Sequence, residues 1–147
     1  MERRRFEISG LVQGVGFRPF LHNLAREKGL TGWVRNNFAG VELEVQGEAE
    51  ALDWFGGELK QRAPVTAVID TMKVTRVEVI PEEQFTILTS EFGELWGSPI
   101  PDQAICDDCR NEFLNQNDRR HHYPLISCAI CGPRFTSMER LPVDRTR

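Results

Sequence analysis

The sequence predicts an α+β protein, in which a domain with the element order β-α-β-β-α-β is followed by a small cysteine-rich module. Two observations support this prediction. Apolar residues alternate with polar ones in several short segments, as in strands, and recur every three to four positions in two others, as in amphipathic helices. All four cysteines lie in the last third of the chain, at positions 106, 109, 128 and 131. The two parts therefore obey different constraints.

The first strand is expected at residues 4–12, where apolar side chains occupy alternate positions. Residues 13–18 (QGVGFR) contain two glycines and do not continue a strand comfortably. Pro19 suits the first position of a helix and Gly29 suits its C-terminal cap, with apolar residues at helical spacing between them. The chain therefore begins as strand, glycine loop and helix, and residues 3–5 are expected to form a solvated terminus.

The second and third strands are expected at 32–36 and 41–45, as a hairpin around a turn at 37–40. Apolar residues at a period of three to four then predict a second helix over 49–59. This segment therefore adds a hairpin and one more amphipathic helix to the first three elements.

Two further strands are expected at 71–79 and 85–88, after which the pattern fades. The complete order is the split βαβ arrangement of ferredoxin-like folds. We therefore expect a ferredoxin-like βαββαβ domain at 1–91, a linker at 92–105 and a zinc-finger-like module at 106–147.

The composition is that of a soluble globular protein, with 40% hydrophobic and 27% charged residues among 147. A net charge of −4 disfavours general nucleic-acid binding, so an anionic ligand would need a local concentration of donors. No stretch approaches the roughly 18 apolar residues of a membrane span, and the N-terminus lacks the apolar core of a secretory signal. We therefore expect a cytoplasmic protein that does not bind a membrane, in a compartment where disulfides are rare.

The glycine loop has the features of a phosphate-binding site. Glycines let successive backbone N–H groups converge on an anion, and the following helix adds donors and partial positive charge at its N-terminus. Arg18 closes the loop with a planar group that can bind two phosphate oxygens. The spacing alone favours a simpler interpretation, a glycine turn beside a surface arginine, because the loop is neither a Walker A nor a GxGxxG motif.

Two motifs in the first part resemble the signatures of the acylphosphatase family. Residues 10–18 (GLVQGVGFR) look like its first signature, G-x-V-Q-G-V-x-F-R, and residues 32–36 (GWVRN) look like its second. The match covers residues 4–90 and falls on the same order of elements. Gly16 departs from the pattern, since a bulky residue often occupies that position. The resemblance implies an acylphosphatase sandwich and an acylphosphatase-type hydrolase acting on an acyl phosphate.

The same resemblance implies roles for individual residues. In that family the arginine that closes the first motif binds the phosphoryl group, and the asparagine that closes the second orients the attacking water, which assigns catalysis to Arg18 and Asn36. The phosphate-binding residues implied with them are Gln13, Gly14, Val15, Gly16, Phe17 and Arg18. From the residues alone, Asn36 could equally cap a hairpin turn, and neither catalytic candidate is expected in the core. Arg35 should face solvent, because it alternates with Val34 and Asn36.

The cysteines form two C-x2-C pairs separated by 18 residues. Each pair can turn two thiolates toward one point, and two pairs complete a closed tetrahedral site for structural zinc. The expected ligands are Cys106, Cys109, Cys128 and Cys131. Two disulfides and a redox-active pair are the alternatives, and the expected compartment argues against the first.

His121 and His122 lie between the two pairs, in a basic run at 119–124. Either histidine could replace a cysteine ligand, but four well-spaced cysteines already complete the site, so both are interpreted as surface residues. A basic run is also the mark of a nucleic-acid-binding zinc ribbon. So few basic side chains make nucleic-acid binding the less favoured interpretation.

Segments of the second part resemble the zinc region of the carbamoyltransferase family that matures nickel–iron hydrogenases. These segments are 101–109, 119–124 and 128–136, and residues 18–20 (RPF) resemble that family's version of the glycine loop. The resemblance implies carbamoyl phosphate as the substrate, which the N-terminal domain hydrolyses to carbamate. It also implies a hydrogenase maturation protein as partner, whose cysteine receives a carbamoyl group that ends as a cyanide ligand on iron.

The transfer steps of that family use ATP and two later domains, so carbamoyltransferase activity is not expected of these 147 residues. Two other classes of function stay open at this stage. The chain could be a module that binds carbamoyl phosphate without significant catalysis. It could also be a zinc-containing interaction module whose α/β domain is a scaffold.

Overall fold

The chain folds in the predicted order of elements, in a computed structural model that describes residues 1–90, 104–128 and 130–132. The sheet domain, residues 1–90, contains β1 (Glu2–Leu11), α1 (Phe17–Glu27), β2 (Thr31–Asn37), β3 (Gly40–Gly47), α2 (Ala49–Gln61), β4 (Val68–Val77) and β5 (Phe85–Ile87). The cysteine module, whose described residues lie between 104 and 132, contains α3 (Asp107–Leu114). The expected linker falls mostly outside the described residues.

The sheet has the strand order β4-β1-β3-β2-β5. Strand β1 pairs antiparallel with β3 and β4, β2 pairs antiparallel with β3, and β5 runs parallel to β2 at the edge. Each helix links two strands that are separated by a third, since β3 lies between β1 and β2 and β1 lies between β3 and β4. This is the split βαβ arrangement, and the ferredoxin-like prediction is confirmed.

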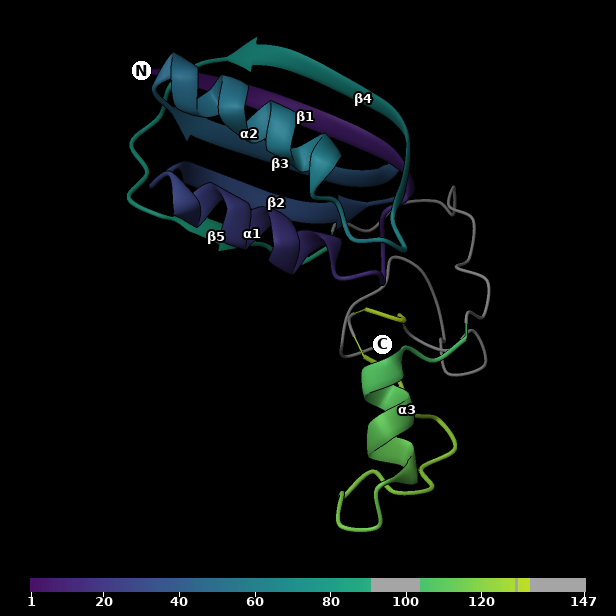
Figure 1. The fold of residues 1–147 in the computed structure, drawn as a ribbon. Helices are drawn as coiled ribbons and strands as arrows, with labels where there is room; N and C mark the ends of the chain where they lie inside the picture. The colour runs from purple at the N-terminus through teal and green to yellow at the C-terminus, as the bar shows by residue number, and fades with distance from the viewer. Residues whose placement is uncertain (91–103, 129, 133–147) are drawn as a thin grey trace.

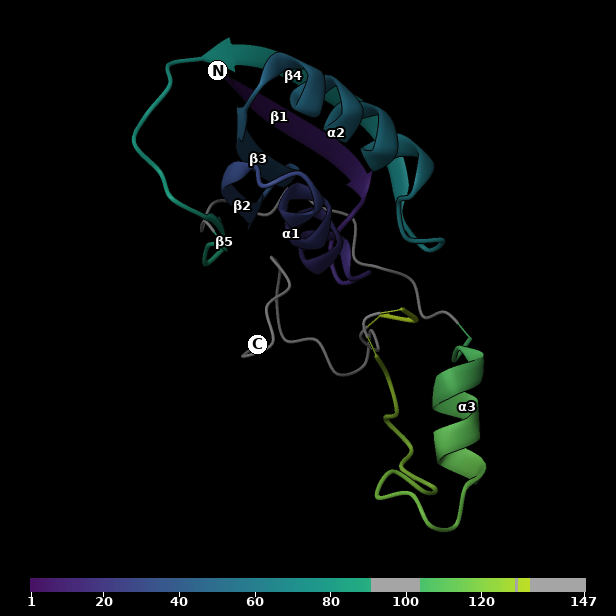
Figure 2. The same ribbon diagram turned by 60° about the vertical axis from the view of Figure 1, so that its left-hand side comes forward.

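Helices α1 and α2 both lie on one face of the sheet, as Figures 1 and 2 show. The side chains buried between helices and sheet form one apolar core. Its members include Phe6, Ile8, Val12, Val15, Phe17, Leu21, Leu24, Val34, Leu43, Val45, Leu52, Phe55 and Leu59. Full burial of one such aliphatic or aromatic side chain stabilises a fold by about 1.5–3 kcal/mol. The sheet domain therefore has a hydrophobic core of its own.

The ends of α1 explain two of the sequence signals. The helix begins at Phe17, so Pro19 lies at its third position. No helical hydrogen bond is lost there, because the first N–H groups of a helix have no partner within the helix. At the other end Gly29, with a φ of 62°, follows the last turn. The amide of Gly29 donates to the carbonyl of Arg26, and the amide of Leu30 donates to that of Ala25. These two bonds form a Schellman cap, which confirms the predicted role of the glycine.

Strand β4 begins and ends earlier than the prediction of 71–79. Its first residues, Val68 and Ile69, pair with Leu11 and Gly10 beyond a register shift in β1. The strand lies at the edge of the sheet, and none of its residues is fully buried. An edge strand with little burial gives a weak alternation of apolar and polar residues, which is why its start was missed.

The outer face of the sheet carries an ionic network, and here one expectation was wrong. Arg3 is not part of a solvated terminus, because only 1% of its surface is exposed. Its Nε donates to Glu44 Oε2 at 2.7 Å, and its Nη1 donates to Glu82 Oε2 at 2.5 Å. Arg5 also donates to Glu44, at 2.5 Å. Arg3 and Arg5 of β1 therefore form an ionic ladder with Glu44 of β3, which pairs antiparallel with β1.

In the described part of the chain, no helix combines the length and the apolar character that a membrane crossing requires.

Candidate functional site

The glycine loop was predicted at residues 13–18, but it occupies residues 12–16 between β1 and α1, because the helix already begins at Phe17. Gly14 and Gly16 have positive φ angles of 71° and 74°, whereas Val15 between them does not. Such alternation of φ turns successive N–H groups toward one side, which makes an anion-binding nest. Gly16 is also the N-cap of α1, and its positive φ explains a glycine where acylphosphatase signatures often have a bulky residue.

Buried apolar side chains and the hydrogen bonds of one polar side chain hold the loop in place. Val12, Val15 and Phe17 are each only 1% exposed and anchor it in the core. The side-chain amide of Gln13 donates to the carbonyl oxygens of Asn37 at 2.7 Å and Gly40 at 2.8 Å. The Gln13 side chain therefore ties the loop to the β2–β3 turn, and the loop is organised before any ligand arrives.

Asn36 lies near the end of β2, one residue before the carbonyl that accepts from Gln13. It shares the inner face of the sheet with Val34, and its exposed fraction is zero. The expectation that Asn36 lies outside the core was therefore wrong. The period of two that places Arg35 outward necessarily turns Asn36 inward, toward the layer of helices.

Arg18 occupies the second position of α1 and is partly buried. Its Nη1 donates to the hydroxyl of Ser90 at 3.4 Å, and Ser90 is itself buried. The segment that carries Ser90 runs beside β2, because the amide of Leu88 donates to the carbonyl of Val34. Ser90 thus joins Arg18 at the candidate site, although no pattern in the sequence pointed to it.

Arg35 lies on the opposite face of β2 from the candidate site. Its Nη2 donates to Glu42 Oε2 at 2.8 Å, and its guanidinium lies 4.9 Å from the centre of the Trp33 ring. The outward direction agrees with the prediction, although the side chain is paired rather than solvated alone. Arg35 is therefore a natural control for Arg18.

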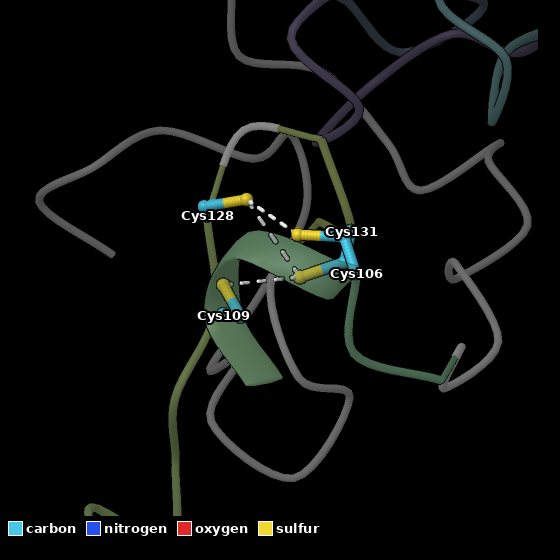
Figure 3. A group of neighbouring side chains, drawn as sticks. All are labelled: Cys106, Cys109, Cys128 and Cys131. Atoms are coloured by element: carbon cyan, nitrogen blue, oxygen red, sulfur yellow. Dashed lines mark hydrogen bonds between the residues drawn. The ribbon is translucent and has the colours of Figure 1, made fainter. Parts of the chain in front are cut away.

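The four cysteines of the second part converge on one point (Figure 3). All their sulfur atoms lie within 4.8 Å of one another, and all four are free thiols, not disulfides. The Cys106–Cys128, Cys131–Cys109 and Cys128–Cys131 sulfur distances are 3.5, 3.8 and 3.9 Å. A tetrahedral ion with metal–sulfur bonds of about 2.3 Å has sulfur–sulfur edges of roughly 3.8 Å. The cluster therefore fits a metal ion held by four thiolates.

Local backbone structure sets the positions of these sulfurs. Cys106 is the N-cap of α3 and Cys109 lies in its first turn, so one helix end directs the first pair. In the second pair, the amide of Ile130 donates to Cys128 Sγ at 3.3 Å. Burial opposes ionisation of Cys131, but hydrogen bonds from the backbone of Cys106 and Cys128 outweigh it and lower the pKa of Cys131 to about 7. Burial raises the pKa of the Cys109 thiol. A bound cation would hold all four as thiolates.

Arg120 is a basic residue that lies beside this cluster. Its Nη2 lies 4.0 Å from Cys109 Sγ, its Nη1 pairs with Glu112, and Nη2 also donates to the carbonyl of Ser127. The two histidines stack on each other, with His121 half-buried and His122 exposed. Neither histidine joins the thiol cluster, which agrees with their interpretation as surface residues.

Comparisons with known proteins match both parts of the chain. The family model described as "Acylphosphatase" matches residues 4–87, and the one described as "HypF finger" matches residues 105–138. An acylphosphatase of Geobacillus thermodenitrificans is 39% identical over 60% of this chain and 95% of its own length.

Longer proteins match both parts at once. "Probable carbamoyltransferase HypF" of Methanocaldococcus jannaschii is 43% identical over 96% of this chain, and the match covers 19% of that protein. The crystal structure of full-length HypF in the phosphate- and nucleotide-bound form has a TM-score of 0.87 and 42% identity, over 99% of this chain and 19% of that one. The chain thus spans about a fifth of the length of the carbamoyltransferases it matches.

Proposed function

We propose that the glycine loop of this chain holds the phosphoryl group of an acyl phosphate during hydrolysis, because the chain belongs to the acylphosphatase family and has a HypF-type finger. The observation that carries the proposal is the backbone of that loop. Gly14 and Gly16 alternate in φ with their neighbours, at the N-terminus of α1 and next to Arg18. These features supply N–H donors, a partial positive charge and a guanidinium at one place.

Each candidate residue has a separate task in the proposed reaction. Backbone N–H groups of the loop and the guanidinium of Arg18 bind the phosphoryl oxygens and stabilise the charge of the transition state. Asn36 orients the attacking water from the end of β2. The side chain of Gln13 holds the loop in position, and the hydroxyl of Ser90 holds Arg18.

The reaction needs little beyond this arrangement. The oxygen of water bonds to phosphorus, the bond from phosphorus to the acyl oxygen breaks, and the carboxylate leaves with its electron pair while a proton passes to solvent. An acyl phosphate is already activated, so positioning and charge stabilisation can supply the acceleration without a general base.

Carbamoyl phosphate is the acyl phosphate that we propose, with carbamate and phosphate as products. The support is the match to HypF carbamoyltransferases over almost all of this chain, together with the similarity to a HypF structure in a phosphate- and nucleotide-bound form. In that setting the domain would serve a cytoplasmic carbamoyltransferase that helps to make the cyanide ligands of hydrogenase, with a maturation protein as partner. We also propose structural zinc as the ion of the four cysteines.

Phosphate release from carbamoyl phosphate by the purified 147-residue chain tests this proposal. The wild-type chain should release phosphate, and Arg35→Ala should do so at the same rate. Arg18→Ala should lose about a hundredfold or more in rate, because a charge-assisted contact in the transition state is lost. Equal losses in the two arginine variants would point to diffuse attraction and overturn the assignment. Phosphate binding without turnover would instead make the chain a binding module.

A further inference from the structure

The two parts of the chain touch at the glycine loop. The cysteine module lies at the end of the sheet domain where β1 leads into α1, in both Figure 1 and Figure 2. A Cβ atom on Gly132 would lie 2.9 Å from the carbonyl oxygen of Gly14, so the two backbones are in direct contact. Beside them, the hydroxyl of Thr66 donates to the carbonyl of Ile130 at 3.1 Å. Two separate contacts therefore join residues 130–132 to the sheet domain.

The contact requires glycine at position 132 for two reasons. Its φ is 74°, in the left-handed region that side chains disfavour. Any Cβ would also approach the Gly14 carbonyl more closely than side-chain carbons normally do. The residue therefore allows the cysteine module to lie directly against the turn that makes the anion-binding nest.

The position of residues 130–132 depends on the thiol cluster. The amide of Gly132 donates to the carbonyl of Cys128 at 2.8 Å, and the amide of Ile130 donates to its sulfur at 3.3 Å. Cys131 lies between the two contact residues and is one of the four converging thiols. A metal that fixes these sulfurs also fixes the two groups that touch the sheet domain.

We propose that residues 130–132 brace the Gly14 turn, so that metal bound by the four cysteines raises the affinity of the glycine loop for a phosphoryl group. This inference rests on the proposed function in one respect, the phosphate-binding role of the loop. The effect is reciprocal, since a metal that strengthens phosphate binding is itself bound more tightly when phosphate is present. Because few groups are in contact, the coupling should be near the low end of the usual range, roughly fivefold.

The test compares zinc-loaded and zinc-stripped chain by two measurements. The first is the ¹H–¹⁵N resonance of Val15, whose N–H belongs to the same peptide group as the Gly14 carbonyl. The second is the dissociation constant for inorganic phosphate. Removing zinc should shift the Val15 resonance and weaken phosphate binding roughly fivefold. Amides of Leu43 and Phe55 in the core should keep their positions, which shows that the sheet domain stays folded.

Thr66→Val isolates the contact while zinc stays bound. It removes only the hydroxyl donor to Ile130 and should weaken phosphate binding roughly twofold, as the loss of one exposed hydrogen bond allows. Thr71→Val is the matched control, because its hydroxyl pairs with Ser9 of β1 and not with a residue of the module, and it should bind phosphate like wild type.

The outcomes separate this inference from the function on which it rests. If neither zinc removal nor Thr66→Val changes the dissociation constant for phosphate or the Val15 resonance, residues 130–132 do not brace the loop. The proposed function would still stand. Absence of phosphate binding in the zinc-loaded wild type would overturn the proposed function and the coupling together.

Discussion

The sheet domain and the cysteine module differ in the size of their apolar cores. The sheet domain buries one continuous apolar core between two helices and five strands. Among the described residues of the cysteine module, the buried apolar cluster consists of Cys109, Ile126 and Cys131, and two of these three are candidate metal ligands. A core of that size cannot offset the entropy of ordering the segment, so we expect a bound metal to supply the difference.

This difference assigns different work to the two parts. The core of the sheet domain anchors the glycine loop through Val12, Val15 and Phe17, and a fixed loop is what positioning a phosphoryl group requires. A segment that folds only with metal makes its contacts conditional on that metal. We therefore expect the proposed chemistry in the sheet domain and any dependence on metal to enter through the module.

Removal of the metal should have the largest effect and should separate the parts. Structural zinc sites in small peptides bind with roughly 10–16 kcal/mol of apparent free energy, which is also their folding free energy. A strong chelator should therefore abolish the dispersion of amide resonances in residues 104–132. A fragment of residues 1–90 should still melt cooperatively, as calorimetry would show. A fragment that melts without a cooperative transition would show that the two parts share a core.

A cavity in the core should damage only the sheet domain. Leu43 is fully buried in the central strand β3, so Leu43→Ala should reduce the free energy of unfolding by about 2–5 kcal/mol. Leu88→Ala, with 40% of the side chain already exposed, is the matched control and should cost well under half as much. Zinc content measured by elemental analysis should be unchanged in both. A loss of bound zinc in Leu43→Ala would show that the two parts do not fold separately.

Asn36→Ala should affect stability and turnover together. The asparagine is fully buried, and removing a buried polar group from its surroundings should cost about 1–3 kcal/mol. Hydrolysis should nearly stop, because the water is no longer oriented, while phosphate should still bind. Asn37→Ala is the control, since its side chain accepts bonds from the amides of Ala39 and Gly40 at 2.9 Å. That variant should lose stability but keep far more turnover than Asn36→Ala, and Asn36→Ala with the parental rate would refute the assigned role.

The ionic ladder should give the smallest effect, a dependence of stability on pH. Burial raises the pKa of Glu44, but hydrogen bonds from Arg5 and Arg3 outweigh it and lower the pKa below its ordinary value. This contribution is complete above the carboxyl's unfolded pKa and is lost as pH falls through the lower folded value. Denaturant melts from pH 7 to pH 3 should show this loss, and Glu44→Gln should flatten it. Glu83→Gln, at an exposed position, should not flatten the pH dependence. Equal curves of stability against pH for the two variants would contradict the role of the ionic ladder.

The fold was predictable from the sequence because local periodicity carries most of it. The strand and helix order, the glycine that closes α1 and the convergence of the cysteines all follow from residues close together in the chain. The ladder was missed because its partners are distant: Arg3 bonds to Glu44, 41 residues away, and to Glu82, 79 residues away. No periodicity marks such contacts, so arginines near a terminus were expected to be solvated.

The candidate site was also predictable only in part. The motifs located the glycine loop, Arg18 and Asn36, but the burial of Asn36 was missed although the alternation of β2 implies it. Ser90 follows the last strand, where no pattern remains, and its bond to Arg18 joins positions 72 residues apart. Gly132 follows the second cysteine pair, where nothing in the sequence marks a contact for it. The reason for its missing side chain, the Gly14 carbonyl, became visible only in three dimensions.

Titration of inorganic phosphate into ¹⁵N-labelled, zinc-loaded chain tests whether the glycine loop is the phosphoryl site. We expect saturable shifts of the amides of residues 14–18 with one dissociation constant, retained in Arg35→Ala and lost in Arg18→Ala. Shifts spread over the outer-face arginines, or a loop that does not respond to phosphate, would contradict it.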